Sequence, residues 1–203
     1  MNDFSVAMAL VDYIPVFLFG AATLLLQKDF YDKMLKGVFA LFAAGTINVF
    51  LAGFLKATWK LLYAAGACDF AALDAMFFPV QSLGFLMAGI AVLLMVVSKK
   101  HKNAMLAVAA PPVFSGTFLF VGLMVAGLGC MNGGLIALAA KEKKVVAIIC
   151  FVLSFLCSLC MGYLSSQDFT QAFMNWMAEI INVIGQGSLL CGTLLLRKKA
   201  AAR

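Results

Sequence analysis

The sequence predicts an all-α protein, a polytopic bundle of transmembrane helices that forms a single domain over residues 1–203. Apolar residues make up 65% of the chain, only 12% are charged, and the mean hydropathy is +1.04. Soluble domains are about half apolar and about a quarter charged. The net charge of +6 comes from short basic clusters beside apolar runs. This pattern is typical of membrane proteins, so we expect membrane lipids as partners and no nucleic acid.

Five apolar runs are each about as long as the ~20 helical residues needed to cross a hydrocarbon core. The first run is too long for the apolar part of a signal peptide and has no basic segment before it, so we expect it to remain as a span. The five predicted helices cover about 4–27, 36–55, 78–97, 145–164 and 176–196.

The segment 104–140 is harder to divide, because it is too long for one ordinary span and barely long enough for two. Basic clusters flank it at 99–102 and 141–144. Two crossings put both clusters on the same side of the membrane, as the bias of lysine and arginine favours. We therefore predict seven helices, with the fourth and fifth at about 104–121 and 122–140. The alternative is six helices with a long, bent fourth helix.

Seven spans in the cell (cytoplasmic) membrane put the N-terminus outside and the basic C-terminus in the cytoplasm. With the fourth helix as a linker, the first three and the last three helices have the same orientation. Short similarities agree: 20–29 aligns with 133–142, and 84–89 with 187–192. They indicate a possible internal repeat in a three-plus-one-plus-three plan, an arrangement of parallel repeats found in some transporters.

Asp12 is the most informative polar residue, because it lies about 12 Å into the first span at 1.5 Å per residue. A lone carboxylate at this depth costs roughly 2.5–3.5 kcal/mol on insertion scales, so it should face protein or water and have a partner. Pro15 should bend or loosen the helix there. Lys56 and Lys60, at the outer end of the second span, are either interfacial lysines beside Trp59 or partners that lock Asp12 or share its site.

Other polar residues reach the same depth. Glu179, Asn182 and Gln186 follow a three-then-four spacing that puts them on one helix face. Such amides either join helices by hydrogen bonds or line a hydrated face that contacts a ligand. The predicted substrate-binding residues are Asp12, Lys56, Lys60, Gln81, Glu179, Asn182 and Gln186, with Tyr13, Trp59 and Trp176 as pocket walls or interface anchors.

Several kinds of chemistry are excluded or left open by residue types. The only histidine, His101, lies in a basic loop, so bis-histidine haem and histidine-based zinc sites are excluded, and we predict no metal or cofactor. The pair Cys157 and Cys160 is either a disulfide-exchanging CxxC motif or ordinary packing. The pattern from Gly122 to Gly127 favours tight helix contact, within the bundle or in a homodimer.

We therefore predict a membrane transporter or uptake component for a small polar or zwitterionic solute, bound in an outward-facing pocket. Asp12 would hold a cationic group or a coupling proton, Lys56 or Lys60 an anionic group, and the amides of the last helix would orient the solute. A non-transporting sensor, or a subunit of a membrane partner, is the alternative. An enzyme is a third class: a thiol oxidoreductase through the CxxC pair, or a lipid-modifying enzyme using Asp12 and Glu179.

Overall fold

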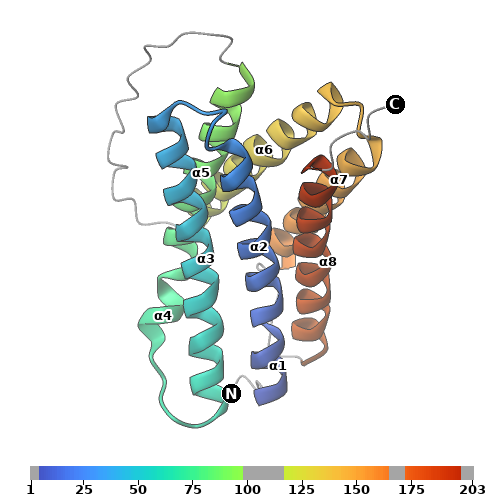
Figure 1. Ribbon diagram of the computed structural model, residues 1–203. Helices are drawn as coiled ribbons and strands as arrows, with labels where there is room; N and C mark the ends of the chain where they lie inside the picture. The colour runs from blue at the N-terminus through green and yellow to red at the C-terminus, as the bar shows by residue number, and fades with distance from the viewer. Residues whose placement is uncertain (1–4, 98–116, 165–171, 198–203) are drawn as a thin grey trace.

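All regular secondary structure is α-helical in the part of the chain that the computed structural model describes, which is 5–97, 117–164 and 172–197 (Figure 1). Six stretches of it are long and apolar enough to cross a membrane. The predicted all-α membrane bundle is confirmed. The described residues contain six long helices, which is the number in the six-helix alternative. The helices are α1 (Val6–Val11), α2 (Tyr13–Phe30), α3 (Lys36–Ala64), α4 (Ala71–Ala75), α5 (Phe77–Val97), α6 (Thr117–Lys141), α7 (Val145–Leu164) and α8 (Ala172–Arg197).

The helix boundaries differ from the predicted ones mainly at α3 and α6. α3 continues well past residue 55 and stops only before Gly66, whose φ of 66° is the left-handed conformation that favours glycine after a helix. α6 runs unbroken through the expected junction of 104–121 and 122–140, so that boundary is wrong. Glycines there do not break the helix, because close packing in membranes tolerates them. The rest of the predicted helix 104–121 lies outside the described residues.

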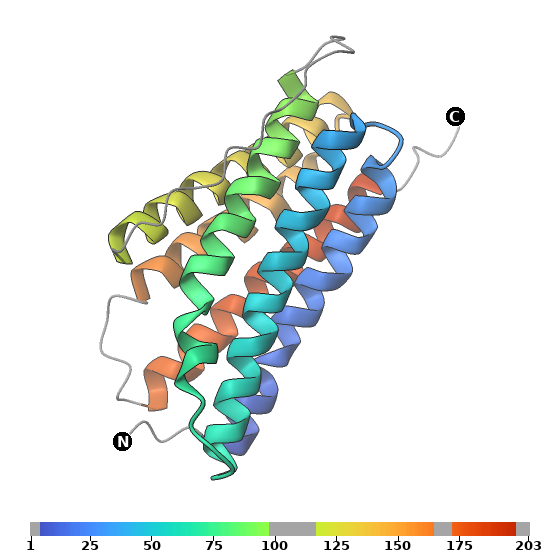
Figure 2. The ribbon, with the colours of Figure 1, turned by 90° about the vertical axis from the view of Figure 1, so that its left-hand side faces the viewer.

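α5 and α6 run in the same direction (Figure 2). Phe85 of α5 lies beside Gly127 of α6, and Val92 lies beside Gly134, so residue numbers rise together along both helices. In a chain of six consecutive spans, the fourth would run opposite to the third. The observed direction of α6 is instead that of α5.

α2 and α8 are also parallel, although they lie far apart in the sequence. Asp29 pairs with Arg197 where both helices end, and Leu18 approaches Gly187 further back along both. Neighbours along the chain are antiparallel: α2 with α3, α3 with α5, and α7 with α8. Each end of the described bundle therefore gathers helix ends from both the early and the late part of the chain.

Glycines allow the backbones of α3, α5 and α6 to touch. A Cβ atom added to Gly45 would lie 2.6 Å from both the carbonyl oxygen of Gly84 and the amide nitrogen of Ala88. The predicted role of the 122–127 pattern in tight packing within the bundle holds for Gly127, which meets the α5 backbone. Gly122 has no neighbour within 4 Å on its Cβ side, so packing in a homodimer stays a prediction.

The two ends of the bundle differ in charge. At one end, Phe30 packs on Phe42 with ring centroids 5.4 Å apart, and Arg197 Nε lies 2.8 Å from Asp29 Oδ2. The opposite end carries the connection 65–76, which contains two aspartates and no lysine or arginine. We call the first the basic end and the second the acidic end. The basic residues of the first are Lys28, Lys33, Lys36, Lys141, Lys143, Lys144 and Arg197.

Replacing Gly45 with alanine tests the α3–α5 contact. Gly45→Ala should lower the free energy of unfolding by roughly 1–3 kcal/mol, because its methyl group meets backbone that cannot rotate away. Thermal unfolding in mild detergent measures the loss. Gly37→Ala is the matched control: it has no neighbour within 4 Å and gains helix propensity, so it should be neutral or stabilising. Equal effects of the two substitutions would contradict the close approach.

Candidate functional site

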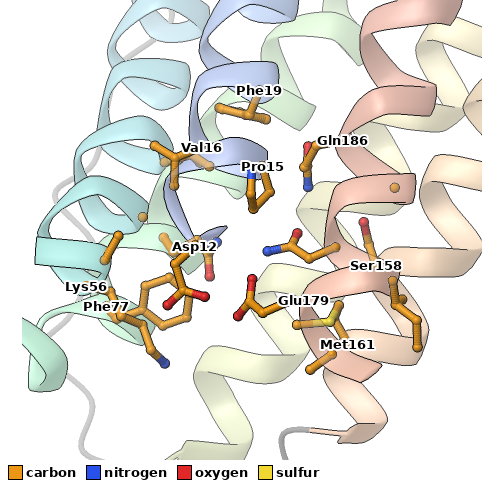
Figure 3. A pocket seen from close by; sticks show the side chains of 18 of the residues that line it. Asp12, Pro15, Val16, Phe19, Lys56, Phe77, Ser158, Met161, Glu179 and Gln186 are labelled. Carbon is orange, nitrogen blue, oxygen red and sulfur yellow. The ribbon is translucent and has the colours of Figure 1, made fainter. Parts of the chain in front are cut away.

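Buried polar side chains at the acidic end line a cavity of about 360 Å³ (Figure 3). Its walls come from the α1–α2 junction and from α3, α4, α5, α6, α7 and α8, so both the early and the late helices contribute. Pockets for small molecules are typically about 300–1,000 Å³. The cavity is therefore large enough for a small organic solute.

The first membrane-spanning segment is interrupted at Asp12, which is a turn between α1 and α2. Pro15 has no N–H to donate to the carbonyl oxygen of Val11, so the helical hydrogen bonding is lost at this point. The predicted loosening of the helix near Asp12 is confirmed, although Asp12 keeps α-helical backbone angles (φ −55°, ψ −25°). The same device recurs at Met76, where α4 ends and α5 begins, three residues before Pro79. Both breaks adjoin the cavity, which is lined by Asp12 and by residues of α4 and α5.

Lys60 joins two carboxylates. Its Nζ lies 2.5 Å from Oδ2 of Asp12 and 3.3 Å from Oε1 of Glu179. The side chains of all three residues are largely buried, at 13%, 7% and 9% exposed. The predicted pairing of Asp12 with a lysine is confirmed for Lys60, and Glu179 is a second acid on the same cation. When all three groups are ionised, this cluster carries one excess negative charge.

Lys56 lies nearer the surface and has a different set of neighbours. Its Nζ is 3.6 Å from Oδ1 of Asp74 and 4.1 Å from the centroid of the Phe77 ring. The side chain of Asp74 is 43% exposed, so this pair is much better solvated than the Lys60 cluster. Sequence reasoning missed Asp74, because it lay in a connection read only for its charge. Pro79, repeating the role of Pro15, was the available signal that this segment shapes the cavity.

Three buried acceptor atoms that belong to cavity-lining residues have no hydrogen-bond partner among the described residues. They are Oδ1 of Asp12, Oε2 of Glu179 and Oε1 of Gln186. In Figure 3 the carboxylates of Asp12 and Glu179 point toward the same space between α2 and α8, and the amide of Gln186 lies beside it with its nitrogen nearer the acids. A buried polar atom without a partner costs about 1–3 kcal/mol. Donor groups brought to this space would therefore be stabilised.

The predicted site residues mostly converge, although two of them do not. Tyr13 follows Asp12 on another face of the helix, where its hydroxyl is 3.0 Å from Thr58 Oγ1 and its ring packs on Phe54. Trp176 is 40% exposed. Neither lines the cavity, so their suggested role as walls is not supported. The predicted residues that do line it are Asp12, Lys56, Lys60, Gln81, Glu179, Asn182 and Gln186, together with Trp59.

The two cysteines of the CxxC pair face different surroundings. Cys157 lines the cavity, whereas Cys160 is exposed, and both are free thiols. Only one of the two sulfur atoms is therefore available to a molecule in the cavity. Among the described residues, no group of three or more histidine, cysteine or acidic side chains could hold a metal ion.

The two lysines should differ sharply in their effect on stability. Lys60→Met leaves two buried carboxylates without a cation, and breaking a buried ion pair in this way costs roughly 3–5 kcal/mol. Lys56→Met should cost less than about 1 kcal/mol, since its partner is half exposed. Thermal unfolding in detergent compares them, and Lys60→Met combined with Asp12→Asn and Glu179→Gln should recover part of the loss. Equal destabilisation by both methionine variants would contradict the central role of Lys60.

Comparison of the chain with models of protein families, with characterised proteins and with solved structures finds no match. The function must therefore be argued from the cavity. Its main features are the Lys60 cluster and three acceptor atoms that have no partner. They lie in segments that are long and apolar enough to cross a membrane.

Proposed function

We propose that the protein is a transporter or uptake component of the cytoplasmic membrane that binds a small polar or zwitterionic solute in this cavity. The observation that carries the proposal is a cavity of about 360 Å³ lined by ionisable and amide side chains within membrane-spanning segments. Ionisable residues in such segments are costly and commonly mark substrate or ion pathways. A salt bridge that only held helices together would not require a cavity of this size.

The charge of the two ends supports an orientation. Lysine and arginine accumulate on the cytoplasmic side of membrane proteins. On this rule the basic end, where α8 finishes, is cytoplasmic, and the acidic end is outside. The N-terminus is then external, and the cavity takes its solute from the exterior.

The packing pattern supports the predicted internal repeat. The halves α2–α3–α5 and α6–α7–α8 each contain two successive helix contacts, and the third helix of each half packs on the first of the other. If the two halves exchange places, α2–α3 maps onto α6–α7, α3–α5 maps onto α7–α8, and α5–α6 maps onto α8–α2. Because α6 runs parallel to α5, the two halves have the same orientation, as a three-plus-one-plus-three plan requires. Transporters built from repeats bind solutes where the repeats meet.

The packing at the basic end of the bundle supports a closed inner gate. The ion pair between Asp29 and Arg197 joins α2 to α8, which belong to different halves. Leu26, Phe30 and Phe42 are almost fully buried close by. Alternating access by movement of one half against the other would open this end while the acidic end closes. The Asp29–Arg197 pair is then a contact that must break in each cycle.

Uptake measurements on two variants test the proposal directly. The purified chain is placed in liposomes and offered a mixture of labelled amino acids, amines, nucleosides and sugars. Asp12→Asn and Asn182→Ala should each reduce the accumulated solute at least roughly tenfold, because the first removes a negative charge and the second an amide from the cavity wall. Glu142→Gln, an exposed acid at the basic end, is the control. Unchanged uptake of every solute in both variants would refute the site, and binding without uptake would favour a sensor or partner subunit.

The inner gate can be tested with Cys157 as a probe of the cavity. In a chain whose other cysteines are replaced by alanine, a membrane-impermeant maleimide should label Cys157 mainly from the acidic end. Asp29→Asn should raise labelling from the basic end severalfold, because the two halves lose their link there. Right-side-out and inside-out vesicles separate the two directions. Glu142→Gln, whose partner Lys144 is on the same half, should change neither rate, and an unchanged pattern in Asp29→Asn would contradict the gate.

A further inference from the structure

We propose that the cavity selects a small organic cation, an amine with an apolar or aromatic body. This inference rests on the proposed function and narrows its solute class from polar or zwitterionic to cationic. It follows from the acceptor atoms at the α2–α8 face of the cavity, from the engagement of both lysines, and from the apolar residues in the rest of the lining.

The atoms that lack partners are all acceptors. Oδ1 of Asp12 and Oε2 of Glu179 belong to carboxylates, and Oε1 of Gln186 is an amide oxygen. A protonated primary amine carries three N–H donors and no acceptor, so it can donate to the oxygens of both carboxylates. Hydrogen bonds between an ammonium and carboxylates are shorter and about twice as strong as neutral ones. An ammonium head is therefore the group that best satisfies this face of the cavity.

Charge leads to the same class of solute. With both acids ionised, the cluster of Lys60 with Asp12 and Glu179 has one negative charge in excess, which either a proton or a single bound cation brings to neutrality. A carboxylate or phosphate would instead have to displace an acid from Lys60. Lys56 is engaged with Asp74 and the Phe77 ring. The structure thus does not favour the earlier expectation that one of the two lysines holds an anionic group.

The lining away from the acids favours an organic cation over an inorganic ion. Phe19, Val49, Phe85 and Leu128 line the cavity and are each only 4% exposed. The rings of Phe19 and Phe85 meet edge to face with centroids 5.8 Å apart. A bare monovalent ion would leave these side chains without a contact in a cavity of about 360 Å³. An aryl or alkyl group attached to the amine would pack against them and gain the stabilisation of apolar burial.

Three probes with one phenyl ring and different headgroups test the inference: benzylamine, benzoate and benzyl alcohol. Each is titrated at neutral pH into the full-length chain in lipid nanodiscs, with sodium chloride at matched concentration as a fourth arm. Benzylamine should raise the unfolding midpoint in a saturable way, since a ligand of the folded state stabilises it by mass action. The other probes should bind at least roughly tenfold more weakly. Equal stabilisation by benzoate, by the alcohol or by sodium chloride would overturn the proposal.

Variants connect the binding to the acceptors. Glu179→Gln should weaken benzylamine binding roughly ten- to hundredfold, because an ionic hydrogen bond is lost. Gln186→Ala should weaken it severalfold, and Glu142→Gln at the basic end should leave it unchanged. If Glu179→Gln does not fold, Gln186→Ala and the headgroup comparison on the natural chain still decide the question. Unchanged binding in folded Glu179→Gln and Gln186→Ala would overturn the assignment of the site.

Uptake by liposomes separates failure of this inference from failure of the proposed function. Benzylamine that binds but is not taken up would support the cation site and contradict transport. Uptake of a zwitterionic or anionic solute that benzylamine does not inhibit would support transport and overturn the cationic class. Saturable uptake of labelled benzylamine that is lost in Glu179→Gln would support both.

Discussion

The arrangement of the acidic end depends on the ammonium group of Lys60, which lies between the carboxylates of Asp12 and Glu179. This contact joins the α1–α2 break to α3 and to α8, so residues from both ends of the chain meet at one buried charge. Such a cluster adds little net stability, because desolvation offsets the attraction, but separating its members is costly. It therefore fixes how these helices align more than it holds the bundle together. Apolar packing and the glycine contacts of α3, α5 and α6 supply the cohesion.

The cavity exists because the helices cannot pack equally closely along their whole length. Around Gly45 and Gly127 the backbones touch. Towards the acidic end, turns at Asp12 and Met76 interrupt α1–α2 and α4–α5, and the proline three residues later has no N–H to restore the missing helical hydrogen bond. Each proline leaves a backbone carbonyl without its helical donor, at a break that adjoins the cavity. The polar residues that are expensive in a membrane are thus gathered where the helix geometry already leaves space.

Depth along a helix could be predicted from the sequence, whereas direction around it could not. Counting residues put Asp12, Lys60 and Glu179 in the same half of the bundle, because the rise per residue is constant. Tyr13 was misjudged since it is adjacent to Asp12 and therefore points elsewhere on the helix. The pairing of Glu179 with Lys60 spans residues far apart in sequence, and no local pattern specifies it. The unbroken α6 was missed because glycine-rich membrane segments serve equally as turns and as close-packed helices.

The excess negative charge of the cluster also bears on how a transport cycle would be coupled. A proton on Asp12 or Glu179 and a bound ammonium are alternative ways to neutralise the same charge, so one disfavours the other. Asp12 immediately precedes α2 and Glu179 lies on α8, and these two helices are tied again at the basic end by Asp29 and Arg197. On the proposed function, a change of counter-ion at one end of this helix pair would act on the elements proposed to close the other end. The parallel α2–α8 seam would then link occupancy of the cavity to the inner gate, and exchange of an amine for a proton would keep the cluster neutral.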